Sequence, residues 1–316
     1  MRIAIIGTGG IGAYYGSRLI ADGQEVHFVA TPRHVEPVRK RGLIAHTDQH
    51  GDATFWPASI TTNPRDIGQV DVVVVAVKLY QLDSALEGIA ALLKDDTIVF
   101  STQNGVTAPE ILARRVGAEH VVPGICYVLA YLEGPGEVTQ KGAQPAFTAG
   151  PRTIAGTENP LIAEFVAALA RQGVAAVVDP TIEHAQWSKF ALIATFGGVC
   201  GLADATIGEV RDFEPTRELL ETSLKEVQAL ARARGVTLTD DDVAEIMRRF
   251  AVQDPSGTTS MQRDIAAGKP SELDFLNGAV ASMAHEAGVA VPVNEVAVAV
   301  LGLRARRNAV ARTTLA

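Results

Sequence analysis

The sequence predicts an α/β domain followed by an all-helical domain, and three observations support this fold class. The 316 residues correspond to about two domains, because domains average roughly 150 residues. Short apolar runs alternate with helical periodicity as far as Asp179-Pro180. Only helical periodicity follows that breaker. We therefore expect an α/β domain at residues 1–180 and a helical domain at residues 181–316.

In the first domain strands alternate with helices, which favours a parallel, doubly wound sheet. Val70–Val77 is rich in valine, as expected for a strand that is covered on both faces. The other expected strands are Ile3–Gly7, Glu25–Ala30, Thr97–Ser101, Val121–Leu132, Ala146–Ala149 and Ala175–Val178. The expected helices are Ala13–Ala21, Val35–Arg39, Pro109–Arg115 and Leu161–Gln172.

The second domain contains five stretches of helical periodicity. Thr237–Asp241 supplies capping residues for the third of them. We expect the basic run Arg304–Arg307 to end the last helix, where cations complement the negative pole. The expected helices are Ile182–Thr195, Pro215–Gly235, Asp240–Gln253, Leu273–Gly288 and Glu295–Ala309.

Composition excludes several classes of protein. The chain is 47% hydrophobic, which is enough for packed cores. Its net charge is −8, whereas a nucleic-acid binder is expected to carry a basic surface. The longest apolar stretch, Phe190–Ala203, is too short to cross a bilayer, and the N-terminus is not organised as a signal peptide. Cys126 and Cys200 are too few for a disulfide framework. We expect a cytoplasmic protein with no nucleic-acid or membrane partner.

The histidines show no spacing typical of metal ligands, so we expect no metal site. We expect them to be surface residues instead. This expectation covers His27, His34, His120, His184 and His285, and also the nearest pair, His46 and His50, which is expected in a polar loop.

A glycine-rich motif follows the first strand and opens the first helix. It fits G-x-G-x-x-G, in which Gly7 permits a tight turn, Gly9 lets a pyrophosphate approach and Gly12 lets helix and strand pack closely. The helix N-terminus then presents free N–H groups to the phosphates. This context predicts a Rossmann-type dinucleotide site, and the alternative is a glycine-rich turn without a ligand. The motif residues are Gly7, Thr8, Gly9, Gly10, Ile11 and Gly12.

The end of the second strand indicates which dinucleotide is bound. An acidic residue there would hold a ribose 2′-hydroxyl, whereas a cation would accommodate a 2′-phosphate. The chain has no carboxylate at this point and instead offers Thr31 and Arg33, which favours NADP(H). The alternative is that Arg33 is a solvated side chain at the start of a helix.

Five polar residues stand where the fold alone does not demand them. Lys78 and Asn104 follow two strands, although a strand-end charge or an Asn-Gly turn would also explain them. Lys189 interrupts an apolar helix, where it could extend to solvent. Glu272 could stabilise a helix dipole, and Ser260 could cap a helix.

Taken together, these motifs resemble the ketopantoate reductase (2-dehydropantoate 2-reductase) family. Six motifs occur in the order that the family shows, and they span nearly the whole chain. They are Gly7–Gly12, Val77–Gln81, Gln103–Gly105, Trp187–Lys189, Ser260–Asp264 and Glu272–Gly278. The resemblance implies a Rossmann domain, a helical domain similar to that of 6-phosphogluconate dehydrogenase, and a role in pantothenate biosynthesis.

The resemblance also implies roles for single residues in reducing a 2-oxo acid with NADPH. Lys189 matches the general acid that protonates the carbonyl oxygen. Glu272 matches a carboxylate beside the substrate hydroxyl and the cofactor, and Asn104 matches a residue beside nicotinamide and substrate. Ser260 matches a contact to the substrate carboxylate, and Lys78 matches a cation at the cofactor or in the active site.

The chain departs from the family pattern at two places. Family members carry asparagines four and eight residues after the catalytic lysine, where this chain has Ile193 and Gly197. Either the substrate is a more apolar 2-oxo acid, or another group such as Thr195 compensates. The usual arginine directly after the second strand is replaced by Thr31, with Arg33 two residues later.

Three functions remain in competition. The first is an NADPH-dependent ketopantoate reductase, and the second is a related reductase or dehydrogenase of another 2-oxo or hydroxy acid. The third is a sensor that binds NADP(H) without turnover, although a sensor needs no proton donor such as Lys189. The expected partner is a small 2-oxo acid, and a homodimer is left open.

Overall fold

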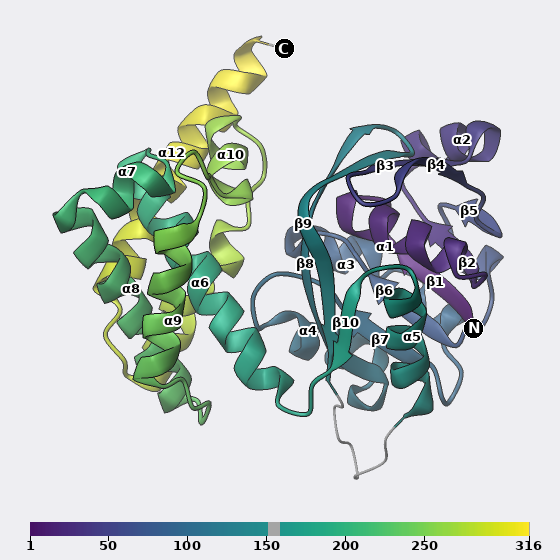
Figure 1. Ribbon diagram of the computed structural model, residues 1–316, viewed down its shortest axis with the longest axis horizontal. Helices are drawn as coiled ribbons and strands as arrows, with labels where there is room; N and C mark the ends of the chain where they lie inside the picture. The colour runs from purple at the N-terminus through teal and green to yellow at the C-terminus, as the bar shows by residue number, and fades with distance from the viewer. Residues whose placement is uncertain (151–158, 316) are drawn as a thin grey trace. The chain divides into compact units, whose positions relative to one another are not determined.

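The computed structural model describes residues 1–150 and 159–315, which form two compact units (Figure 1). The α/β unit consists of residues 1–104 and 108–182, and the helical unit consists of residues 105–107 and 183 onward. The segment Gly105–Thr107 thus belongs to the helical unit, although it follows a strand of the α/β unit. The sequence pattern gives no sign of this excursion.

The α/β unit is built on a ten-stranded sheet in the order β4-β3-β9-β8-β7-β6-β1-β2-β5, with β10 beside β9. Its parallel part places β1 (Arg2–Ile6) between β2 (Glu25–Val29) and β6 (Val72–Val75). β5 (Ser59–Thr61) lies beyond β2, and β7 (Ile98–Ser101) lies beyond β6. This arrangement confirms the predicted Rossmann-type fold.

The sheet is mixed, which corrects the expectation of a parallel sheet. β8 (Val121–Gly134) and β9 (Glu137–Ala149) form a long antiparallel hairpin. Gly136 in their turn has φ +74°, a conformation that glycine adopts readily. β3 (Leu43–Thr47) and β4 (Gly51–Phe55) form a second antiparallel pair. Short hairpin connections of this kind produce antiparallel pairs, whereas parallel strands need a crossover.

The sequence analysis missed β3, β4 and β5, and it expected only the last four residues of β9. β4 and most of β9 carry polar residues in place of an apolar run, and most of β4 is exposed, whereas the apolar runs of β3 and β5 are no longer than three residues. The remaining elements of the unit lie close to their expected positions, except for the short helix α3, which the sequence pattern did not predict. They are α1 (Gly10–Ala21), α2 (Pro32–Arg41), α3 (Leu82–Ala85), α4 (Ala108–Val116), α5 (Pro160–Arg171) and β10 (Ala175–Val178).

Two histidines are buried, so the expectation that all of them are surface residues is wrong. His27 lies on β2, and its Nδ1 is 2.8 Å from Ser59 Oγ. His34 accepts a hydrogen bond from Gly136 N at its Nδ1 (3.2 Å), which ties α2 to the turn of the β8–β9 hairpin. Burial lowers the pKa of both imidazoles, and this favours their neutral forms.

The helical unit contains the expected helices and two shorter ones, α7 and α10, but the helix expected at Leu273–Gly288 is interrupted at Leu276, so a 3-10 turn precedes α11. Thr239 caps α9 through a capping box with Asp242, as predicted. The bounds are α6 (Ile182–Ala203), α7 (Ile207–Asp212), α8 (Glu214–Ala233), α9 (Asp240–Val252), α10 (Ser260–Ala266), η5 (Leu273–Phe275), α11 (Asn277–Ala287) and α12 (Pro292–Leu315). Within the described ranges, no helix is long and apolar enough to cross a membrane.

The last helix corrects another expectation, because α12 continues past Arg304–Arg307 to Leu315. Arg304 does not end its own helix. Its Nη1 donates to the carbonyl of Gly201 (2.8 Å), in the last turn of α6. A cation there complements the negative pole of α6.

Candidate active site

The glycine turn between β1 and α1 excludes side chains at its two ends. Gly7 has φ +103°, and a Cβ built on it would lie 2.7 Å from Val77 Cγ1. A Cβ on Gly12 would lie 2.0 Å from the Gly7 carbonyl oxygen. These two glycines are required by the packing of the turn itself.

Gly9 is different, because its closest neighbour to a built Cβ is Ala76 O at 4.0 Å. The protein has room for a methyl group there, so packing does not explain this glycine. Gly9 also caps α1 without any side-chain hydrogen bond, which leaves the helix N-terminus open to an anion. The turn therefore fits the pyrophosphate of a dinucleotide.

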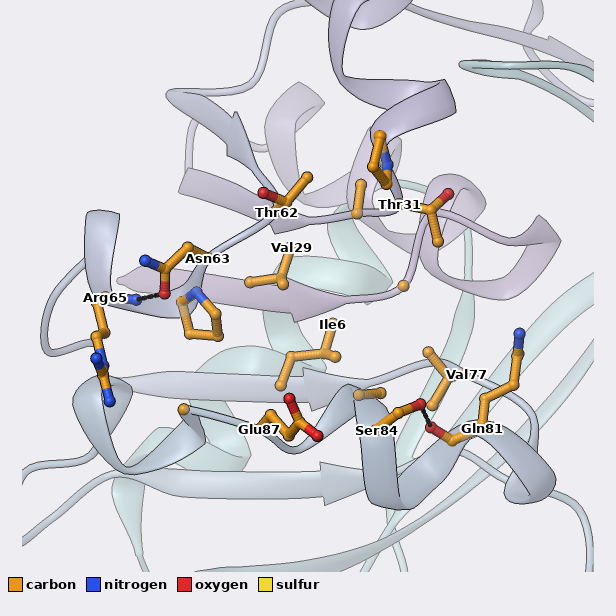
Figure 2. Close-up of a pocket in the computed structure, with 16 residues that line it drawn as sticks. Ile6, Val29, Thr31, Thr62, Asn63, Arg65, Val77, Gln81, Ser84 and Glu87 are labelled. Carbon is orange, nitrogen blue, oxygen red and sulfur yellow. Dashed lines mark hydrogen bonds between the residues drawn. The ribbon is translucent and has the colours of Figure 1, made fainter.

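A pocket of about 500 Å³ extends from this turn inside the α/β unit (Figure 2). It lies at the carboxyl ends of β1, β2, β5 and β6, which is where ligands bind in open α/β sheets. Thr31 lines it, and although Thr31 caps α2, its hydroxyl makes no capping hydrogen bond. Its position after β2 suits contact with an adenosine ribose.

Arg33 does not line this pocket, although the sequence pattern pairs it with Thr31. Its Nε lies 3.0 Å from His34 Nε2. Among the pocket-lining residues the one cation is Arg65, which follows β5 in an Asn-Pro turn. Asn63 fixes this turn by accepting a hydrogen bond from the Arg65 backbone N–H (3.1 Å), as Figure 2 shows. Sequence reasoning missed Arg65, although the Asn-Pro turn signal was available.

Gln103 connects the strand ends that precede Lys78 and Asn104. Its Nε2 donates to the carbonyls of Val75 (2.8 Å) and Val77 (3.0 Å). Gln103 belongs to the Gln-Asn-Gly motif, but the sequence alone gives no sign of this contact. The structure shows that Gln103 fixes the backbone directly before Lys78. Asn104 is the residue that follows Gln103 in the sequence.

In the helical unit, α6 carries Lys189 on a largely buried helix. Trp187 and Phe190 on either side are buried and pack edge to face at 5.7 Å, and Lys189 itself is half-buried. Thr195 is fully buried, and its hydroxyl lies 3.1 Å from Ser223 Oγ. The Thr195 hydroxyl is therefore occupied inside the helical unit, and its suggested role as a replacement for the missing substrate contact stays a prediction.

The start of α10 lies against the same helix. A Cβ on Gly197 would lie 2.8 Å from Met261 Cε, which places Met261 two turns along α6 from Lys189. Ser260 is exposed and is the first residue of α10. It does not cap the helix, because Thr259 does so by accepting a hydrogen bond from Gln262 N (3.1 Å).

The segment with Glu272 is held against α6 by Asn277. Glu272 is only 3% exposed, and its carbonyl accepts a hydrogen bond from Leu276 N (2.9 Å). Asn277 follows at once, and its Nδ2 donates to the carbonyl of Ala194 on α6 (3.1 Å). The helical unit thus brings the elements that carry Lys189, Ser260 and Glu272 together.

Gly105 connects the Gln-Asn-Gly motif to that same segment. It has φ +93°, and a Cβ built on it would lie 3.2 Å from the carbonyl oxygen of Phe275. The glycine turn, Thr31 and Lys78 belong to the α/β unit, and the roles assigned to all these residues stay predictions.

Comparison with known proteins agrees with this geometry. Models of "Ketopantoate reductase PanE/ApbA" and of its C-terminal part match residues 3–153 and 181–305. A 2-dehydropantoate 2-reductase of Mycobacterium tuberculosis (strain CDC 1551 / Oshkosh) is 30% identical over 303 residues, covering 95% of this chain and 96% of that protein. One from Halobacterium salinarum is 29% identical over 298 residues, covering 93% and 95%.

Solved structures are similar over the whole chain. A PanE/ApbA family ketopantoate reductase from Ralstonia eutropha JMP134 superposes with a TM-score of 0.87 at 30% identity, covering 98% of this chain and 99% of that chain. A D-mandelate dehydrogenase solved with NADH and anilino(oxo)acetate has a TM-score of 0.88 at 23% identity, covering 98% and 99%, which shows a shared fold.

A Rossmann-type unit with an open glycine turn, joined to a helical unit that carries Lys189 and Glu272, defines an oxidoreductase. Both family models and the relatives cover nearly the full length. The chain belongs to the ketopantoate reductase family.

Proposed function

We propose that the chain reduces a 2-oxo acid to a 2-hydroxy acid with NADPH, and that 2-dehydropantoate (ketopantoate) is the first candidate substrate. The product would be pantoate, for pantothenate and coenzyme A biosynthesis. The observation that carries the proposal is family membership over both units, together with the six motifs. Relatives described as 2-dehydropantoate 2-reductases match more than nine-tenths of the chain.

Bound NADPH supplies the hydride that forms the new C–H bond at C2 of the substrate. In the proposed mechanism the turn at Gly9 and the N-terminus of α1 hold the pyrophosphate, with Thr31 and Lys78 at the rest of the cofactor. Lys189 holds a proton at Nζ and delivers it to the carbonyl oxygen as the C=O π bond breaks, and solvent replaces that proton. Glu272 then accepts a hydrogen bond from the substrate hydroxyl.

The remaining predicted contacts orient the substrate. Ser260 would bind its carboxylate, and Asn104 would place the reacting carbon beside the nicotinamide. The burial of Glu272 supports its proposed hydrogen bond to the substrate hydroxyl, because such bonds are stronger where water is excluded.

A second candidate is the reduction of a more apolar 2-oxo acid, and one observation favours it. The face of α6 that leads away from Lys189 presents Ile193 and then Gly197, which packs against Met261. Because the Thr195 hydroxyl is occupied in the core, no other polar side chain among residues 190–197 replaces the family's asparagines.

NADPH oxidation with a matched pair of substrates separates these candidates. Ketopantoate and 3,3-dimethyl-2-oxobutanoate differ by one hydroxyl group. A site that binds this hydroxyl should discriminate by orders of magnitude in kcat/KM, because the analogue leaves its polar groups unpaired. Comparable or faster turnover of the analogue would favour the second candidate. Binding of NADPH without oxidation by any 2-oxo acid would contradict both and favour a sensor.

A further inference from the structure

A buried chain of polar groups crosses the helical unit from α8 to α6. It begins at Glu226 on α8, whose side chain is buried. The carboxylate accepts hydrogen bonds from Val293 N (2.8 Å), Asn294 N (3.1 Å) and Asn294 Nδ2 (2.7 Å). The two backbone donors lie in the first turn of α12, where N–H groups lack helical partners. No cation pairs with Glu226 in the part of the chain that the structure describes.

The carboxylate dictates how the next two amides are turned. A carboxylate only accepts hydrogen bonds, so Asn294 must present Nδ2 to Glu226 and leave its Oδ1 facing the other way. Asn294 Oδ1 accepts from Asn277 Nδ2 (2.9 Å). The same Asn277 Nδ2 donates its second hydrogen to the carbonyl of Ala194 (3.1 Å). One charged group therefore fixes two amide orientations in sequence.

The last member of this series of hydrogen-bonded groups, Asn277, lies between the two elements that carry Lys189 and Glu272. Ala194 is five residues after Lys189 on α6, about 7.5 Å along the helix axis. On the other side, Asn277 follows Leu276, whose N–H is bonded to the Glu272 carbonyl. The contact requires glycine at position 198, because a Cβ there would lie 2.5 Å from Asn277 Nδ2.

Stability alone does not account for this arrangement. Asn277 is 1% exposed, and its Oδ1 has no hydrogen-bond partner among the described residues. An unpaired buried acceptor is unfavourable, and an apolar side chain packed at this position would avoid it.

We propose that Asn277 is a positioning residue that sets the distance between Lys189 and Glu272, and that Glu226 orients its amide through Asn294. The inference rests on the proposed function, because it assumes that Lys189 and Glu272 act on one substrate. It adds three residues to the machinery that touch neither cofactor nor substrate.

The test separates lost packing from lost positioning. Asn277→Ala removes the amide and leaves a hole, whereas Asn277→Ala/Gly198→Ala places a methyl group in that space without restoring the hydrogen bonds. We expect the double variant to regain thermal stability, while kcat stays about 10- to 100-fold below wild type because a misplaced general acid is costly. The Kd for NADPH should not change. The basic limb of the pH profile of kcat should shift in both variants.

Asn308→Ala is the matched control, because Asn308 Nδ2 also donates to a helix carbonyl of this unit, that of Ile265 (3.0 Å). It should lower stability and leave kcat and its pH profile within about twofold of wild type. If the double variant recovers kcat and the pH profile together with its stability, Asn277 is merely structural and the proposal is overturned.

Amide hydrogen exchange without substrate tests, independently of activity, whether Asn277 holds the Glu272 segment against α6. Asn277→Ala/Gly198→Ala should exchange faster than wild type in α6 around Ala194 and in the segment 272–277, whereas Asn308→Ala should not. Unchanged exchange there would overturn the proposal even if the protein is an active reductase. Faster exchange in a protein without reductase activity would show that Asn277 does join the Glu272 segment to α6, and would contradict only the proposed function.

Discussion

The two units of this protein differ in how they supply their predicted functional groups. In the α/β unit the glycine turn works through absent side chains, since a Cβ at Gly7 or Gly12 meets the surrounding backbone or Val77. In the helical unit the predicted groups are side chains, Lys189 and Glu272, which stand on separate elements. Asn277 joins those elements to each other through a contact between residues 83 positions apart.

This difference explains why the glycine turn could be predicted from the sequence pattern alone, whereas the site of Lys189 and Glu272 could not. A backbone site needs a short contiguous motif at a strand–helix junction, so spacing alone predicts it. A side-chain site on several helices has no fixed local spacing. Here the apolar helix around Lys189 drew attention to that lysine, but the roles of Lys189 and Glu272 came only from the family resemblance.

The largest predicted effect is that of removing Lys189, the proposed general acid on the helical unit. Lys189→Ala should lower kcat by about 10²–10⁴-fold, because the carbonyl oxygen loses its proton donor. The Kd for NADPH should stay near wild type, since the dinucleotide pocket lies inside the α/β unit. Lys225→Ala, which removes an exposed lysine of the same unit, is the control. A rate for Lys189→Ala within a few-fold of wild type would exclude the assigned role.

The second prediction concerns the glycine turn. Gly9→Ala should raise the Kd for NADPH by at least about tenfold, or about 1.4 kcal/mol, with the midpoint of thermal unfolding unchanged. The reason is that the added methyl group would not clash with the protein but would occupy the space that the proposed pyrophosphate needs. Gly12→Ala should lower stability as well, because its Cβ meets the Gly7 carbonyl. Unchanged NADPH binding by Gly9→Ala would contradict a pyrophosphate at this turn.

A smaller effect distinguishes Arg33 and Arg65, the two arginines that follow β2 and β5, as contacts for a 2′-phosphate. Arg65 lines the pocket and Arg33 does not, so Arg65→Gln should weaken binding of adenosine 2′,5′-bisphosphate more than Arg33→Gln. Loss of one charge-assisted contact corresponds to about tenfold in Kd. Calorimetry with adenosine 5′-monophosphate as the reference ligand isolates the phosphate contribution. The reverse ranking would restore the interpretation based on Thr31 and Arg33.

The smallest effect is the pH dependence of stability at the edge of the α/β unit. Asp52 and Glu137 beside His46 raise the pKa of its imidazole above the ordinary value of 6.5. The resulting stabilisation is complete below about pH 6.5 and is lost as the pH rises through the pKa of the folded state. His46→Gln should therefore lower the urea midpoint at about pH 5.5 more than at about pH 8. The effect is small because the side chain is one-third exposed.

His50→Gln is the control for this measurement, because His50 lies in the same hairpin and has no ion pair among the described residues. Equal losses at both pH values for His46→Gln would show that its charge does not contribute.

Buried, regular elements were predictable from the sequence, and irregular polar ones were not. The strand around Val72–Val75 and the helix α1 follow from apolar pattern and glycine spacing. β4 carries little apolar surface, and the excursion of Gly105–Thr107 leaves no local signal. In the site, Gln103 has a role that depends on two carbonyls of a neighbouring strand, which no spacing reveals.

One measurement tests the central claim directly, namely that both units serve a single hydride transfer. NADPH deuterated at the transferable C4 position is incubated with the enzyme and ketopantoate or its apolar analogue, and the product is analysed by mass spectrometry. The account predicts one deuterium on C2 of a 2-hydroxy acid, and none with Lys189→Ala on the same timescale. Tight binding of the deuterated NADPH without labelled product from any 2-oxo acid would contradict it.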